Sequence, residues 1–304
     1  MKQSPPSRRL WGLIPCGLLL LLSGCKGGVF DPKGQVAVDE RNLIILATAL
    51  MLLVVIPVIV LTLVFAWKYR AGNAKATTYL PKWAHSTKIE LIVWLVPCAI
   101  VAALAYVVWT STHRLDPYRP LDSKVAPVRI EAVSMDWKWL FIYPDLGIAT
   151  VNQIAFPVGT PINFSITSDS VLNSLLIPQL GGQIYAMPGM RTKLHLIADH
   201  AGEYQGLSAA YSGGGFSNMQ FKALAMATPA EFQQWVAKVR QSKEAPLDEA
   251  RYRALAKPSE NSPVTYFPSV PTDVFHYALH QYMNMPKTQP AEAHAAMHEH
   301  QGKE

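Results

Sequence analysis

Two long apolar runs stand out in the pattern of hydrophobic and polar positions. Residues 43–66 (LIILATALMLLVVIPVIVLTLVFA) and 89–109 (IELIVWLVPCAIVAALAYVVW) are almost continuously apolar. At ~1.5 Å of helix rise per residue the first run extends about 36 Å, enough to cross a hydrocarbon core of ~30 Å. The pattern therefore predicts two transmembrane helices, the first of them bent near Pro57.

A shorter apolar run precedes them at the N-terminus. It follows a basic start and is too short to span a bilayer comfortably, so residues 1–24 are predicted to be a secretory signal peptide. The stretch LSGC at 22–25 resembles the lipobox of bacterial lipoproteins, which implies cleavage before Cys25 and a lipid on that cysteine. The alternative is an ordinary signal peptide with a coincidental cysteine. Residues 25–42 then form a periplasmic segment before the first span.

The charges between the two spans predict their orientation. This loop holds basic residues and no acidic one: Lys68, Arg70, Lys75, Lys82 and Lys88. The positive-inside rule places such a loop in the cytoplasm. Residues 43–109 are therefore expected to form a transmembrane hairpin in a bacterial cell inner membrane, with both termini in the periplasm.

After residue 109 the pattern changes to short segments typical of strands. A polar linker at 110–126 comes first. The strand-like segments are 128–143, 149–157, 161–168, 173–178, 183–187, 191–198, 203–211 and 219–226, with Gly, Pro, Asp and Asn between them. Many short strands with such turns favour an antiparallel all-β sandwich over residues 127–227.

Helical patterns return beyond residue 227. Thr228 and Glu231 have the spacing of a capping box, and Phe232, Trp235, Val236 and Val239 then recur at helical spacing, so 228–242 is predicted to be a helix. Short helices are also expected at 247–256 and from about 272, within an aromatic-rich extension that ends near 285. Residues 286–304 are polar and are expected to be disordered.

Cysteine usage and charge exclude several functions for the exported part. No cysteine follows Cys98, so this part has neither a disulfide nor a thiolate for a metal. The basic excess lies in residues 1–9 and in the loop between the spans, which leaves the exported part slightly acidic. We therefore expect no basic patch there and no nucleic-acid partner.

The histidines and methionines of the exported part are weak candidates for metal ligands. His276 and His280 have the i, i+4 spacing of a helical metal pair, but without a third ligand a surface pair is the simpler interpretation. His195 and His200 have no partner at motif spacing. Other possible donors are Met187, Met190 and Met219, which are expected in the core, and His294, His298 and His300 in the tail.

Glu90 is the one carboxyl group just inside the second span. A carboxyl group in a membrane segment is costly, though less so near the end than at the centre. Two interpretations remain open from the residues alone. The side chain either reaches the cytoplasmic headgroups or collects protons at the mouth of a channel in a partner.

Several motifs resemble subunit II of the haem-copper oxidases. The resemblance rests on the two spans, the exported sandwich, the run SMDWKW at 134–139 and the glycine-rich stretch near 213. It implies a cupredoxin-like sandwich. In the cytochrome c oxidases of this family the sandwich holds a dinuclear copper centre, with ligands from an early histidine and a C-S-E-x-C-G-x-x-H-x-x-M run. Such a centre needs two bridging thiolates because soft sulfur binds and delocalises charge.

The corresponding run here is residues 208–219, SAAYSGGGFSNM. The positions that match the copper ligands are Asn173, Ser208, Ala210, Ser212, Phe216 and Met219, and Met219 alone keeps the family's residue. The resemblance therefore implies a chain without metal, cofactor or catalytic residue of its own.

A subunit II sequence without copper ligands resembles the quinol oxidase branch of the family, which is of the cytochrome bo type. Further matches are DPKGQ at 31–35, FAWKYRA at 65–71 and ATVNQIAFP at 149–157. The branch implies a proton-pumping complex that oxidises ubiquinol and reduces oxygen to water, with haems, copper and quinol site in subunit I. The expected partners are subunit I, smaller membrane subunits and lipid, and not cytochrome c.

The same resemblance gives interpretations for three residues. It associates Glu90 with proton uptake into subunit I. Trp137 and Trp139 correspond to aromatic residues that serve cytochrome c docking and electron transfer in copper-bearing relatives, and here we expect them to serve packing or subunit contact.

Two rival functions were weighed. One is a copper-bearing cytochrome c oxidase subunit, which the absence of exported cysteines argues against. The other is a membrane-tethered binding protein or metallochaperone that uses Met187, Met190, Met219 and His195. A two-span hairpin is needlessly elaborate for a tether.

Overall fold

The computed structural model describes residues 28–70 and 84–281. These residues form two compact units, one of 38–116 and one that combines the described residues before 38 with those after 116. The predicted signal peptide, the lipidation site Cys25 and the predicted tail at 286–304 lie outside the described residues.

The first unit consists of two long helices, α2 (Gln35–Lys68) and α3 (Thr87–Arg114). They contain the two predicted spans and are the described helices long and apolar enough to cross a membrane. Most of their apolar side chains are exposed, as expected for surfaces that meet lipid or another subunit. An ion pair of 2.8 Å between Asp39 and Arg114 joins α2 to α3.

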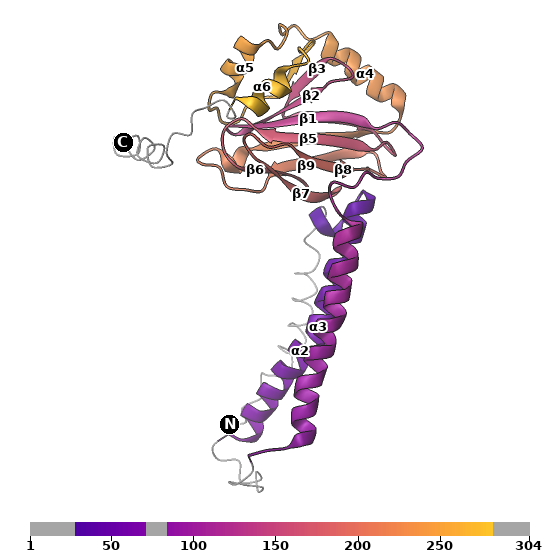
Figure 1. The fold of residues 1–304 in the computed structure, drawn as a ribbon, viewed down its shortest axis with the longest axis vertical. Coiled ribbons are helices and arrows are strands. Elements are labelled where there is room, and N and C mark those ends of the chain that lie inside the picture. The colour runs from indigo at the N-terminus through magenta and orange to yellow at the C-terminus, as the bar shows by residue number, and fades with distance from the viewer. Residues whose placement is uncertain (1–27, 71–83, 282–304) are drawn as a thin grey trace, which may run out of the picture. The chain divides into compact units, whose positions relative to one another are not determined.

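The second unit is a sandwich of two sheets that follows a short 3-10 turn, η1 (Gly28–Phe30). The six-stranded sheet has the order β11-β3-β2-β1-β5-β8, and Figure 1 shows β1 and β5 side by side within it. Its strands are β1 (Val128–Met135), β2 (Lys138–Tyr143), β3 (Ile148–Val151), β5 (Ile162–Ser168), β8 (Thr192–Leu196) and β11 (Thr265–Phe267).

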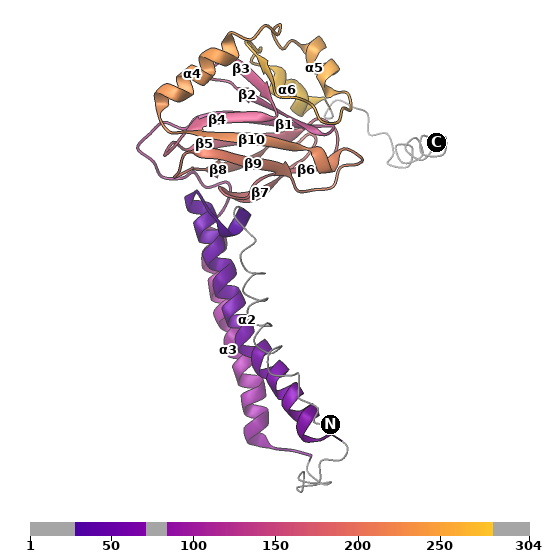
Figure 2. The same cartoon turned by 180° about the vertical axis from the view of Figure 1, so that it is seen from behind.

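The five-stranded sheet has the order β4-β10-β9-β6-β7 and faces the viewer in Figure 2. Its strands are β4 (Gln153–Pro157), β6 (Asn173–Ile177), β7 (Gly181–Ala186), β9 (Gly202–Ser208) and β10 (Gln220–Met226). The predicted all-β sandwich is confirmed, but the purely antiparallel expectation is wrong. The pairs β1–β5 and β4–β10 are parallel, because their connections cross over rather than turn back as hairpins.

Two of the predicted long strands are each broken by one residue with a positive φ. Trp137 has a φ of 65° and separates β1 from β2, which pair as a hairpin. Asn152 has a φ of 55° and separates β3 from β4, which belong to different sheets. The strand pattern of residues 128–143 did not reveal the first break, since such a pattern does not report the conformation of a single residue.

The strand β2 is buried along its whole length because both of its faces are covered. Trp139, Phe141 and Tyr143 point to the core between the sheets. Leu140 and Ile142 join a second cluster with the C-terminal extension. This alternation explains why β2 has no polar face in the sequence.

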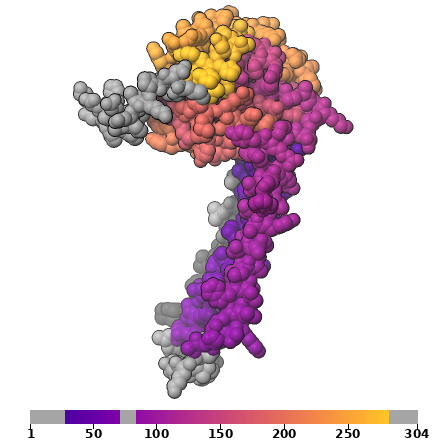
Figure 3. Space-filling view, in the orientation of Figure 1, coloured from indigo at the N-terminus to yellow at the C-terminus, as the bar shows by residue number. Residues whose placement is uncertain are grey.

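The extension contains α4 (Pro229–Arg240), α5 (Glu249–Ala256) and α6 (Val274–His280), which confirms its predicted helices. Thr228 caps α4 by accepting a hydrogen bond of 3.2 Å from the amide of Glu231. The four predicted apolar residues of α4 are buried, while the strand β11 was not predicted. In Figure 3 the yellow end of the extension lies directly against the magenta and pink part of the surface.

Candidate functional site

The loop that matches the copper-binding run, residues 208–219, connects β9 to β10 at the end of the five-stranded sheet. Asn173 begins β6 and Ser208 ends β9, and these strands are neighbours. Both side chains are buried, and the Ser208 hydroxyl donates a hydrogen bond of 2.7 Å to Asn173 Oδ1. Two of the six matched positions are therefore bonded to each other.

The other four matched positions are Ala210, Ser212, Phe216 and Met219, and each has different surroundings. The carbonyl of Ala210 is 3.5 Å from Ser208 Oγ. Met219 is buried in the main core, whereas Phe216 is half-buried with its ring edge-on to that of Tyr211. The hydroxyl of Ser212 and the Nδ2 of Asn173 are buried without a hydrogen-bond partner among the described residues.

The loop at residues 208–219 packs on the side chain of Trp137. Its indole Nε1 donates a hydrogen bond of 3.1 Å to the carbonyl of Ser212. A Cβ atom on Gly215 would lie 2.5 Å from the indole ring, and one on Gly213 would lie 3.2 Å from it. The loop thus packs on an aromatic ring, and glycine is needed where the backbone meets that ring. Trp139 is fully buried beside Phe141 and Phe221, which confirms its expected packing role.

The residues of this loop do not fit a dinuclear copper centre. The side-chain donors at the matched positions are the hydroxyls of Ser208 and Ser212, the amide of Asn173 and the buried thioether of Met219, and none of them supplies the bridging thiolate that such a centre needs. The cysteine that the structure describes is Cys98, in α3. Across residues 28–70 and 84–281, no group of three His, Cys, Asp or Glu side chains could hold a metal ion.

The weaker metal candidates are not gathered into one site. His276 and His280 are exposed, and their rings stack at 6.0 Å, so they form the expected surface pair. His195 lies on β8, where its Nδ1 is 2.8 Å from the carbonyl of Pro117. Met219 is a core residue, but the same expectation is wrong for Met190, which is exposed on the turn after β7.

Glu90 occupies the first turn of α3. Its carboxylate accepts a hydrogen bond of 3.4 Å from the amide of Ser86, and its other oxygen lies 3.1 Å from Nε2 of His85. A carboxylate in the first turn stabilises a helix through the helix dipole. Sequence reasoning missed His85, although a histidine five positions before the carboxyl group was a signal that could have been read.

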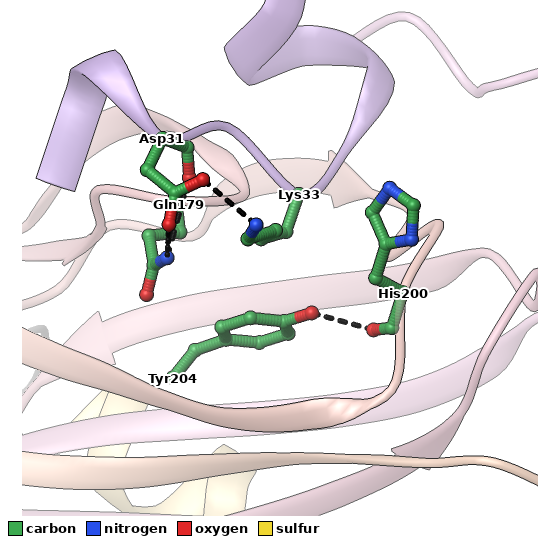
Figure 4. A network of polar contacts seen from close by, with 5 residues as sticks. All are labelled: Asp31, Lys33, Gln179, His200 and Tyr204. Carbon is green, nitrogen blue, oxygen red and sulfur yellow. Dashed lines mark hydrogen bonds and ion pairs between the residues drawn. The ribbon is translucent and has the colours of Figure 1, made fainter. Parts of the chain in front are cut away.

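Sequence reasoning also missed the contact made by residues 31–35, which we call the N-terminal clasp (Figure 4). The amide of Lys33 donates to the carbonyl of Gln179, and the amide of Asp199 donates to the carbonyl of Lys33, both at 2.7 Å. A Cβ atom on Gly34 would lie 2.3 Å from the carbonyl oxygen of Ile197. The backbone of the clasp therefore contacts the backbone of the sandwich directly.

Side chains complete the clasp. Gln179 Nε2 donates to the carbonyl of Asp31 at 3.2 Å, and the Asp31 carboxylate pairs with Lys33 at 2.7 Å. Beneath them in Figure 4 the Tyr204 hydroxyl donates to the carbonyl of His200 at 2.5 Å. Burial, then the charges of Asp199 and Asp31, raise the pKa of Tyr204, because each disfavours the phenolate.

A buried polar group ties the C-terminal extension to the sandwich. The Asp169 carboxylate accepts from the Tyr252 hydroxyl at 2.5 Å and from Gln281 Nε2 at 2.8 Å. Lys138, on β2, donates to the carbonyl of Lys257 at 2.8 Å, and burial lowers the pKa of its ammonium group. These contacts fasten the extension over the outer face of the six-stranded sheet.

Comparison with known proteins agrees with these features. Residues 145–225 match the family described as cytochrome c oxidase subunit II, periplasmic domain, and residues 240–285 match the one described as the COX aromatic rich motif.

Three curated relatives match most of the chain. It is 58% identical over 287 residues to the cytochrome bo(3) ubiquinol oxidase subunit 2 of Pseudomonas putida, with 94% of this chain and 90% of that one covered. The protein of the same description from Pseudomonas aeruginosa is 63% identical over 263 residues, covering 86% and 78%. The ubiquinol oxidase subunit 2 of Acetobacter aceti is 53% identical over 278 residues, covering 91% and 88%.

Proposed function

This chain belongs to the ubiquinol oxidase subunit 2 family, and from that membership we propose that it is the copper-free second subunit of a proton-pumping quinol oxidase. The complex oxidises ubiquinol and reduces oxygen to water. The proposal that this chain has no copper relay rests on the hydrogen bond between Ser208 and Asn173. Copper-bearing relatives have ligands at these two positions.

The chemistry of the electron donor supports a subunit without its own redox centre. Cytochrome c delivers electrons from the aqueous periplasm, so an oxidase that uses it needs an exported relay. Quinol is lipid-soluble and reaches a membrane subunit from within the bilayer. The haems, the copper of the oxygen-reducing site and the quinol site are then all assigned to subunit I, and this chain contacts no cytochrome c.

The two helices α2 and α3 supply the membrane attachment. Their exposed apolar surfaces are suited to packing against subunit I and the smaller membrane subunits. The basic loop between them favours a cytoplasmic position, which puts both termini in the periplasm of a bacterial inner membrane. A lipid on Cys25 adds a further anchor in this arrangement.

Glu90 is proposed to take up protons for subunit I. The carboxylate stands at the cytoplasmic end of α3, and His85 lies 3.1 Å from it as a second group able to hold a proton. The competing role is structural, because the same carboxylate accepts the amide of Ser86 at the start of the helix.

Glu90→Gln separates these two roles. Glutamine keeps an oxygen that accepts the Ser86 amide but cannot take up a proton. The account expects quinol-driven oxygen consumption to fall several-fold with unchanged haem content. Glu249→Gln, on the exposed face of α5, is the matched control and leaves turnover unchanged. Unchanged turnover and proton uptake in Glu90→Gln would reject the role.

The quinol oxidase assignment itself is tested by purification through a tag on this chain. Haem absorption, quinol-driven oxygen consumption and no oxidation of cytochrome c are the expected results. Recovery of the chain without a haem subunit, together with bound copper, would instead support a metal-binding lipoprotein.

A further inference from the structure

A polar hollow of about 250 Å³ lies on the outer face of the six-stranded sheet, apart from the loop and the N-terminal clasp. Its polar and charged lining residues are Arg129, Glu131, Asn163, Ser165, Arg191, Lys193 and His195. The sequence led us to expect no basic patch on the exported part, and the hollow is a small mixed cluster in which Arg129, Arg191 and Lys193 lie beside Glu131. Arg129 is distant in the chain from Arg191 and Lys193, and the fold brings it beside them.

Strand register explains this grouping. Arg129 on β1, Asn163 on β5 and His195 on β8 lie in one row across the sheet. Glu131 and Lys193 lie in the next row, on either side of Ser165. Side chains of both rows point to the same face because their positions in each strand differ by two.

Two of the three cations of the hollow are held in place by neighbouring side chains. Arg191 donates from Nε and Nη2 to the hydroxyl of Ser165, and its guanidinium group lies 5.9 Å above the ring of Phe275. Arg129 is paired with Asp145, with Nε to Oδ2 at 2.8 Å. Lys193 is exposed beside them.

Glu131 is the carboxylate among the described lining residues of the hollow. Burial raises the pKa of this group, although the charges of Arg191, His276 and Arg129 act in the opposite direction. Arg191 and Lys193 therefore face a single carboxylate that is poorly solvated. A doubly charged or resonance-stabilised anion would add the negative charge that this arrangement lacks.

We propose that this hollow binds a phosphate-class oxyanion, either free in solution or carried by a lipid headgroup. Guanidinium and ammonium groups together with an amide and a hydroxyl are the donors that phosphate oxygens prefer. The exported part of a membrane-tethered chain meets both sources of phosphate. The site does not depend on the proposed role in quinol oxidation.

Titration of the detergent-purified complex with inorganic phosphate tests the free-ion source. Arg191→Ala combined with Lys193→Ala is expected to weaken binding about tenfold or more, because two charge-assisted contacts are lost. Glu131→Gln is expected to strengthen binding several-fold, because it removes the repelling carboxylate. Lys222→Ala, which breaks an exposed ion pair with Glu203 on the other sheet, is the control and leaves binding unchanged.

Nanodiscs test the headgroup source. The complex is placed in phosphatidylcholine with and without phosphatidylglycerol, and the phosphatidylglycerol that remains bound after release is counted by native mass spectrometry. Retention that falls in the double variant and rises in Glu131→Gln, without binding of inorganic phosphate, identifies a headgroup site.

The two substitutions act in opposite directions, which separates the proposal from a loss of folding. If the double variant fails to assemble, the binding measured for Glu131→Gln still tests the proposal, because a damaged protein does not bind phosphate more tightly. Binding of phosphate and retention of phosphatidylglycerol that are both unchanged in Glu131→Gln would overturn the proposal.

Discussion

The loop at residues 208–219 and the N-terminal clasp at residues 31–35 are held on the same sandwich in different ways. The loop keeps the spacing of a copper-binding run. At its base the amide of Ala209 donates to the carbonyl of Ser174, while its glycine-rich part packs on the Trp137 indole, which also donates to the carbonyl of Ser212. The clasp matches no metal motif, and it is held by backbone hydrogen bonds and by a glycine pressed against a carbonyl group.

The difference shows which contacts depend on residue identity. In the loop, side chains have replaced ligands, and a flexible ring can adjust to further replacement. In the clasp, the closest approach is between the backbone at Gly34 and the carbonyl of Ile197, and backbone atoms cannot turn away. We therefore expect the clasp to be the more sensitive of the two regions, although the loop is the one that matches a functional motif.

The largest effect is expected from Gly34→Ala in the clasp. The new Cβ atom would lie 2.3 Å from the carbonyl oxygen of Ile197, so the clasp has to move and lose its backbone hydrogen bonds. The free energy of unfolding should fall by about 2–4 kcal/mol. Thermal unfolding of the purified complex measures this.

Gly214→Ala is the control for this variant, since its Cβ atom would meet nothing closer than 3.9 Å. A melting temperature of Gly34→Ala equal to that of the control would contradict the proposed importance of the clasp.

A smaller effect is expected from Gly215→Ala in the loop. Its Cβ atom would lie 2.5 Å from the ring of Trp137, and the ring has to shift away from the carbonyl of Ser212. The cost should be about 1–2 kcal/mol, less than for Gly34→Ala, because a side chain moves more easily than a strand. The same unfolding measurement, with Gly214→Ala beside it, checks the order. A greater loss of unfolding free energy for Gly215→Ala than for Gly34→Ala would show that the loop, and not the clasp, is the more sensitive region.

Ser208→Ala should cost about 1 kcal/mol by removing the hydrogen bond to Asn173. Adding Asn173→Leu should restore part of the loss, since no buried amide is then left without a partner. Quinol-driven oxygen consumption per haem should not change in either variant, because the proposed function routes no electron through this loop. A fall in turnover with unchanged haem content would argue for a redox role.

The smallest effect is expected from Tyr204→Phe beneath the clasp. At pH 7 the lost hydrogen bond to His200 should cost less than about 1 kcal/mol. Because the pKa of Tyr204 is raised in the folded protein, its contribution is fully present below the unfolded pKa of about 10 and is lost as the pH rises through the folded pKa.

The stability difference between Tyr204→Phe and the unmodified protein should therefore shrink above pH 10. Unfolding curves at pH 7 and pH 11 measure it. A difference that stays constant over this range would show that Tyr204 does not titrate differently in the folded state.

Much of the fold could be predicted from local patterns. The two spans follow from the length of their apolar runs, and the start of α4 follows from Thr228 and Glu231. The parallel pairs and the strand β11 were not predictable in this way, because they depend on which distant segments meet. The breaks at Trp137 and Asn152 depend on single backbone angles, which a strand pattern does not report.

For the candidate site, too, local sequence patterns predicted some features, whereas contacts between distant segments could not be predicted. Motif spacing located the positions of the loop, but not that Ser208 and Asn173 bond to each other. Asp31 and Gln179 of the clasp region are 148 residues apart, and in the polar hollow Arg129 of β1 lies beside Arg191 and Lys193 at the start of β8. Contacts of this kind are set by topology and register, which a single sequence does not display.

The most direct test of the central account is the near-infrared spectrum and copper content of the complex, purified through a tag on this chain. The account predicts no near-infrared absorption from a dinuclear copper centre and the same copper content per haem in Met219→Leu as in the unmodified complex. A near-infrared band, or copper that is lost in Met219→Leu, would contradict it.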